Sequence, residues 1–136
     1  MTTPRRPAHD LHADGGTVHA GAAAHAAERA MVLIHGRGAS PESILALADE
    51  LPPDLGFTFV APGASATTAH PRSWYPHSFL APVEANEPGL SSALAKIEST
   101  VLELEAHGIA REATILLGFS QGACLAVEYA ARHAQR

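Results

Sequence analysis

The sequence has little cysteine, no long apolar run and no excess of positive charge, and each absence excludes a class of protein. Cys124 is the one cysteine among 136 residues, so an internal disulfide is excluded. No stretch approaches the roughly 18 apolar residues that a membrane-spanning helix needs. The formal net charge of -5 argues against nucleic acid or an anionic membrane as a partner.

Residues 1–28 carry no convincing targeting signal and no periodic pattern. Arg5 and Arg6 precede His, Asp and Gly rather than an apolar segment, which argues against a signal peptide or a twin-arginine leader. A cytoplasmic location is therefore expected. Because this region is rich in Ala, His, Gly and Pro, we expect a mobile arm with room for one short strand at Thr17 to Ala20. Its histidines and aspartates fit no zinc-ligand spacing, so no metal site is expected.

The most informative stretch begins with a short apolar run, Thr114 to Leu117, which predicts a buried strand. Gly118-Phe119-Ser120-Gln121-Gly122 follows it and matches the G-x-S-x-G pattern, in which a serine occupies a tight strand-to-helix turn. Glycine is needed two positions to either side because side chains there would collide with the turn. The following residues predict a helix, whose N-terminus favours a developing negative charge near the serine.

A second apolar run, Met31 to His35, leads into the glycine-rich turn Gly36-Arg37-Gly38. Acyl transfer creates a negative carbonyl oxygen that two main-chain N–H groups stabilise. One comes from the residue after the nucleophile and the other from a loop on a neighbouring strand. In this sequence the donors would be Gln121 and Arg37.

The two turns resemble those of the α/β-hydrolase fold, and specifically those of the bacterial phospholipase/carboxylesterase family, which also includes the acyl-protein thioesterases. Members carry Leu-His-Gly-x-Gly at the first turn and Gly-Phe-Ser-Gln-Gly-[Gly/Ala] at the second. Ile34 to Gly38 and Gly118 to Ala123 match these motifs, with Ile in place of the first leucine.

This resemblance implies a serine hydrolase that cleaves a small-molecule carboxylic ester or thioester through an acyl-serine intermediate, with no cofactor. It implies Ser120 as the nucleophile, the Arg37 and Gln121 N–H groups as the oxyanion hole, and Gly118 and Gly122 as the elbow glycines. A lactone or dienelactone substrate is an alternative, but relatives of that type commonly use cysteine as the nucleophile, so Ser120 argues against it.

The remaining patterns predict one α/β domain over residues 29–136, a parallel sheet with helices on both faces. Ser40-Pro41-Glu42 predicts a helix start, and Pro52-Pro53 ends that helix. Phe57 to Val60 predicts the next strand, and this strand-helix-strand unit implies a parallel pair with a right-handed crossover. A long helix is expected from Leu90 to His107, with a buried apolar stripe.

The segment between Ala61 and Pro88 has no periodicity and is rich in Pro, Gly, Ser and aromatic residues. Long irregular loops are commonly functional, and this one leaves the carboxyl end of a predicted strand. Trp74, Tyr75 and Phe79 are therefore interpreted as walls of the substrate pocket, and a tryptophan-bearing loop of this kind resembles that of family members. The alternative is that these aromatic residues only anchor the loop to the sheet.

The acid and base of a triad are missing from the expected place. Family members carry an aspartate and then a histidine well after the serine, whereas only 16 residues follow Ser120. Two other sources are His35 and the loop histidines His70 and His77, because geometry rather than chain order defines a triad. The favoured interpretation is an amino-terminal portion of an α/β hydrolase, with activity belonging to the complete enzyme. The alternative is a catalytically inactive remnant that associates with itself through the apolar edge of the strand at Thr114 to Leu117.

Overall fold

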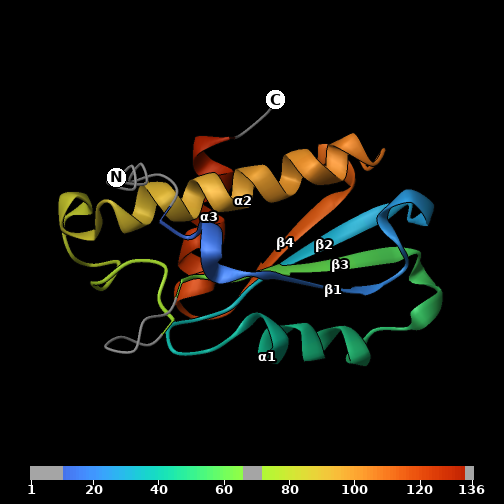
Figure 1. Cartoon of the computed structure of the whole chain (residues 1–136), viewed down its shortest axis with the longest axis horizontal. Coiled ribbons are helices and arrows are strands. Elements are labelled where there is room, and N and C mark those ends of the chain that lie inside the picture. Colours follow the sequence, from blue (N-terminus) through green and yellow to red (C-terminus); the bar gives the residue numbers. More distant parts are fainter. Residues whose placement is uncertain (1–10, 66–71, 134–136) are drawn as a thin grey trace, which may run out of the picture.

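A mixed sheet of four strands organises the chain, in the order β1-β3-β2-β4 (Figure 1). The computed structural model describes residues 11–65 and 72–133. The strands are β1 (Thr17–Gly21), β2 (Arg29–Ile34), β3 (Phe57–Pro62) and β4 (Thr114–Gly118). β2 is parallel to both β3 and β4, whereas β1 runs antiparallel to β3.

β2, β3 and β4 lie where the apolar runs predicted them, and a short strand is also present near Thr17, as expected. The sheet is not parallel throughout, however, because β1 is antiparallel to its neighbour. The chain between Gly21 and Arg29 is too short for the crossover that parallel strands need, so β1 and β2 run in opposite directions. Residues 17–21 are thus part of the sheet, and the division between an arm and a domain at residue 28 stays a prediction.

Helices cover both faces of the sheet, as expected (Figure 1). The α-helices are α1 (Pro41–Leu45), α2 (Gly89–Ala106) and α3 (Gln121–Arg132). Short 3-10 helices are Ala13–Gly15, Ala24–Ala26, Ala46–Glu50, Pro53–Leu55, Val83–Asn86 and Arg111–Ala113. Side chains alternate along β2, so that Val32 packs toward α2 and α3 while Leu33 packs toward α1. Both sides are fully buried, which explains the continuous apolar sequence of this strand.

The first helix begins as predicted but is shorter. The hydroxyl of Ser40 accepts a hydrogen bond from the Ser43 N–H (3.1 Å), and the Ser40 N–H donates to the Ser43 hydroxyl (3.1 Å). After Leu45 the chain winds more tightly, with about three residues per turn, into a 3-10 helix. Leu47 lies in this 3-10 segment and is 45% exposed.

The long helix α2 confirms its prediction closely. Its apolar stripe is buried throughout, and it consists of Leu90, Leu94, Ile97, Val101 and Leu104. The helix ends before Gly108, which has a φ of +94°. No helix within the described ranges is long and apolar enough to cross a membrane.

β4 is the edge strand of the sheet, with β2 on one side of it. The other side carries no strand in the described part of the chain. Ile115 on this strand is 48% exposed, and the strand contains neither a charged residue nor proline. The edge therefore lacks the features that usually discourage pairing with another strand.

Candidate active site

Ser120 lies at the tip of the turn between β4 and α3, outside both elements. Its φ is +55° and its ψ is -117°, and it is the one residue other than glycine with a positive φ in the described ranges. A side chain in this region of φ/ψ space strains the backbone by about 1–3 kcal/mol. The surrounding contacts must therefore hold the serine in place.

The two glycines of the motif leave no room for side chains. A Cβ atom on Gly118 would lie 2.3 Å from the Gly122 carbonyl oxygen. A Cβ atom on Gly122 would lie 2.0 Å from the carbonyl oxygen of Ile34, the last residue of β2. The first collision is within the turn itself, and the second shows that the start of α3 packs directly on the neighbouring strand.

The Gly36-Arg37-Gly38 turn lies against the serine turn because β2 and β4 end at the same level. Ile34 is paired with Gly118 in the sheet, and the Phe119 N–H donates a hydrogen bond to the Ile34 carbonyl (3.2 Å). A Cβ atom on Gly36 would lie 3.4 Å from the Ser120 Cβ. Within the described residues, the main-chain N–H groups of Arg37 and Gln121 donate to no main-chain carbonyl.

A cavity of about 310 Å³ lies beside Ser120. The residues that line it are Arg37, Tyr75, His77, Ser78, Phe79, Ser120, Gln121 and Cys124. They come from three separate parts of the chain: the turn after β2, the loop before α2, and the serine turn with the first residues of α3. Two turns predicted from sequence thus share one cavity with part of the aromatic loop.

The three aromatic residues assigned to the pocket walls occupy different positions. Tyr75 and Phe79 line the cavity, and Phe79 is 68% exposed. Trp74 does not line it: its side chain is fully buried, stacks on the His35 ring and donates from Nε1 to the His35 carbonyl (2.9 Å). The Trp74 side chain therefore anchors the loop to the sheet, which was the alternative interpretation of these aromatic residues.

The side chains of Gln121 and Arg37 bind the aromatic loop, which the motifs did not reveal. Gln121 Oε1 accepts from the Trp74 N–H (2.8 Å), and its Nε2 donates to the Tyr75 carbonyl (2.9 Å). Arg37 Nη2 donates to the carbonyls of Tyr75 (3.1 Å) and Pro76 (2.9 Å). The motifs assign a function only to the main-chain N–H groups of these two residues, so sequence gave no signal for these contacts.

His35 is a buried neutral histidine with both ring nitrogens in use. Nδ1 donates to the Gly36 carbonyl (2.7 Å), and Nε2 accepts from the Ala64 N–H (3.1 Å). A carbonyl can only accept and an N–H can only donate, so these partners define one tautomer. Burial lowers the pKa of His35 below its ordinary value. Both ring nitrogens therefore bind main-chain groups, and neither is free to act as a base.

His12 has the same arrangement, although sequence placed it in a mobile arm. Its Nε2 donates to the Trp74 carbonyl (2.8 Å) and its Nδ1 accepts from the Ser65 N–H (3.1 Å). Burial is again the main cause that lowers the pKa of the ring. The rings of His12 and His35 thus contact Trp74 from two directions, at centroid distances of 5.2 and 5.1 Å.

In residues 11–65 and 72–133, no side chain forms a hydrogen bond with the Ser120 hydroxyl, so the hydrogen bonds do not identify a base. His77 lines the same cavity, and His70 falls outside the described residues. His133 bonds the Tyr129 carbonyl and lies 3.4 Å from Glu98, so it is engaged elsewhere. In these same ranges no group of three or more potential metal ligands occurs.

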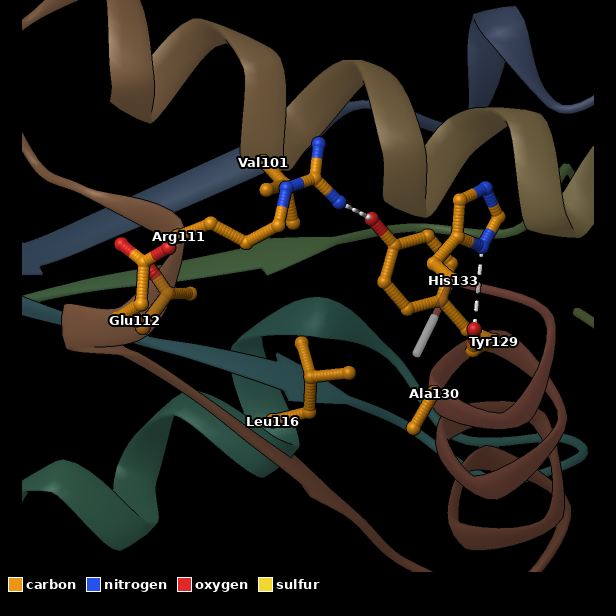
Figure 2. A pocket seen from close by; sticks show the side chains of 8 residues that line it. Val101, Arg111, Glu112, Leu116, Tyr129, Ala130 and His133 are labelled. Atoms are coloured by element: carbon orange, nitrogen blue, oxygen red, sulfur yellow. Dashed lines mark hydrogen bonds between the residues drawn. The ribbon is translucent and has the colours of Figure 1, made fainter. Parts of the chain in front are cut away.

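A second cavity, of about 300 Å³, lies near the far end of α3 (Figure 2). Arg111 there binds the Glu98 carboxylate (2.8 Å) and the Tyr129 hydroxyl (2.7 Å), and that hydroxyl donates to Glu98. Burial, followed by Glu98, raises the pKa of Tyr129 to about 12. His133 stacks on Tyr129. These groups satisfy one another and join α2 to α3, which indicates a structural cluster.

Comparison with known proteins gives a consistent result. A model of the phospholipase/carboxylesterase family matches residues 17–136. A crystal structure of a phospholipase/carboxylesterase from Dyadobacter fermentans is similar, with 42% identity over 90% of this chain and a TM-score of 0.79. The structure of esterase PE8 has 29% identity over 87% of this chain and a TM-score of 0.65.

A more distant structure, acyl-protein thioesterase 2 of Zea mays, shares the fold at 20% identity, with a TM-score of 0.63 over 85% of this chain. The chain spans only 56%, 57% and 51% of these three structures, in the order given. No protein of curated function matches the sequence.

Proposed function

Because the chain belongs to the phospholipase/carboxylesterase family, we propose that Ser120 is the nucleophile of a hydrolase that cleaves carboxylic ester or thioester bonds. The activity is that of a complete enzyme of which this chain spans part, since it covers little more than half of the similar structures. The substrate is a small molecule that carries an acyl group.

One observation carries the proposal: Ser120 is held with a positive φ at a strand-to-helix turn, directly against the Gly36 turn. Such strain persists only where surrounding structure enforces it, and it is concentrated at functional sites. A serine lifted out of a turn beside two main-chain N–H groups meets the geometric requirement for acyl transfer.

The reaction has two halves. The Ser120 oxygen bonds to the carbonyl carbon while its proton passes to a base, and the resulting oxyanion accepts hydrogen bonds from the N–H groups of Arg37 and Gln121. Collapse of this intermediate breaks the bond to the alcohol or thiol, which leaves with the proton. Water then attacks the acyl-serine and gives a proton to the base. The bond between the acyl carbon and the Ser120 oxygen breaks, the base returns the proton to that oxygen, and the acid is released.

The reaction also needs a base near the Ser120 hydroxyl. His77 is the histidine that lines the Ser120 cavity in the described ranges, whereas both nitrogens of His35 are already bonded. His77→Ala tests whether His77 is that base. If labelling of Ser120 is unchanged in that variant, the base comes from elsewhere.

The test uses a fluorophosphonate probe, which forms a covalent bond with an activated serine. We expect mass spectrometry to find the label on Ser120 in the wild-type chain and none on this peptide in Ser120→Ala. The control is Ser99→Ala, because Ser99 is an exposed serine on α2. Equal labelling of the wild type and Ser120→Ala, with the probe on another residue, would remove the proposed nucleophile.

A further inference from the structure

We propose that the side chain of Gln121 is a positioning residue that fixes the loop from Ser73 to His77 as a wall of the Ser120 cavity. The effect of Gln121 on catalysis rests on the proposed function. Its effect on the position of the loop does not depend on that function. The loop has no helix or strand between residues 72 and 82, so side-chain contacts rather than a hydrogen-bond ladder define its position.

The Gln121 amide binds the loop through both of its polar atoms. Gln121 is 8% exposed, and its Oε1 and Nε2 atoms pair with the Trp74 N–H and the Tyr75 carbonyl, at 2.8 and 2.9 Å. A single amide thus accepts from one loop residue and donates to the next, much as a neighbouring strand would. Neither loop group is left unpaired in the interior.

The Tyr75 carbonyl is the point where three parts of the site converge. It accepts from Gln121, from Arg37 Nη2 (3.1 Å) and from the Ser73 hydroxyl (2.7 Å). Gln121 comes from the serine turn and Arg37 from the turn after β2. Both residues also supply the proposed oxyanion donors through their main chains, so the same two residues define the oxyanion position and the adjacent wall.

The consequence concerns the shape of the cavity. Tyr75 and Phe79 line it, and the loop between them is tied further by the His77 N–H, which donates to Asn86 Oδ1 (2.7 Å). Loss of the Gln121 contacts would loosen the inner end of this wall, where Arg37 and the Ser73 hydroxyl would be the remaining donors to the Tyr75 carbonyl. The acyl or alcohol group would then be less tightly selected by size, since a looser wall fits probes of different length more equally.

The Trp74 N–H needs an acceptor and the Tyr75 carbonyl needs a donor, and the Gln121 amide supplies both. Two substitutions test this pair of hydrogen bonds. Gln121→Met keeps the length and removes both hydrogen bonds. Gln121→Glu keeps an acceptor for the Trp74 N–H but, when ionised, places a carboxylate oxygen against the Tyr75 carbonyl. Val127→Met and Val127→Glu are the matched controls, because Val127 is 71% exposed on the same helix.

The structural test is amide hydrogen exchange of the full 136-residue chain, followed by NMR. We expect exchange of the Trp74 N–H to accelerate on the order of tenfold in Gln121→Met, because its acceptor is lost, and by a smaller factor in Gln121→Glu. Each rate is divided by that of Ile97, a buried residue of α2, so that global destabilisation cancels. An unchanged Trp74 to Ile97 ratio in both variants would overturn the proposal.

The functional test compares labelling of Ser120 by an ethyl and an octyl fluorophosphonate. In the wild type, the ratio of the two labelling rate constants measures how strongly the cavity selects probe length. We expect this ratio to come several-fold closer to one in Gln121→Met. The change should lie in the half-saturating concentration of the probe and not in the limiting labelling rate. The Val127 variants should keep the wild-type ratio. If the wild type itself is not labelled, Ser120 is not activated within this chain, while the exchange result still decides the role of Gln121. An unchanged ratio would remove its effect on specificity.

Discussion

Replacing Ser120 by glycine should stabilise the fold. The residue has φ +55° and ψ -117°, where only glycine is unstrained. Relief of this strain is worth about 1–3 kcal/mol, from which about 0.5–1 kcal/mol is subtracted for the greater flexibility of glycine in the unfolded chain. We therefore expect Ser120→Gly to be more stable than Ser120→Ala by about 0.5–2 kcal/mol.

Ser99 provides the opposite case. It is an exposed residue inside α2, where alanine is favoured over glycine by about 1 kcal/mol. Ser99→Ala should therefore be more stable than Ser99→Gly. The glycine variant is thus expected to be the more stable one at position 120, and the alanine variant at position 99. Loss of the serine hydroxyl is common to all four variants, so it cannot explain this reversal.

The measurement is urea unfolding, followed both by circular dichroism and by the fluorescence of Trp74. The midpoints should differ while the slopes stay equal, since the surface exposed on unfolding is the same. In thermal unfolding, each kcal/mol corresponds to roughly 4 °C at this chain length. If glycine is less stable than alanine at position 120 as well, the turn is not strained and the argument from strain to function is refuted.

Three further predictions concern pH, packing and association. Burial lowers the pKa of His12 and His35 below 6.5, so the unfolded chain binds protons that the folded chain does not. Stability should therefore rise with pH up to about 6.5, by at most about 1.4 kcal/mol per pH unit for each ring, and a flat profile of urea midpoints would contradict this. Gly122→Ala should lower the free energy of unfolding by about 2 kcal/mol or more, because its Cβ would lie 2.0 Å from the Ile34 carbonyl oxygen. We expect wild-type chains to associate through β4 in sedimentation experiments and Ile115→Lys to reduce this, whereas a monodisperse wild-type monomer would count against pairing at that edge.

The strands and α2 were predictable because their signals are local. The apolar run of β2 and the stripe from Leu90 to Leu104 follow from a side-chain period that the backbone itself imposes. The serine turn was predictable for the same reason, because its whole signal, one serine and two glycines, lies within five consecutive residues. The tighter winding after Leu45 was not, because 3-10 turns are common at the ends of α-helices and no pattern in the sequence marked this one.

The contacts that shape the site depend instead on distant parts of the chain. Nothing near His12 shows that its ring meets Trp74, and no local pattern links the Gln121 amide to Tyr75. Long loops lack a period, so sequence could assign Trp74 to either a wall or an anchor. The roles given to Ser120 and to the two N–H groups stay predictions that chemistry must test.

The position of β2 in the middle of the sheet has a consequence for the order of folding. Met31 pairs with Phe59 on one side and with Ile115 on the other, so its second partner is synthesised much later. Bringing together more distant segments costs more chain entropy and is slower. The β2–β3 pair is thus expected to form early, and β4 to dock last. The serine turn and the turn after β2 would meet only in that final step, which makes the reactive geometry a late product of folding.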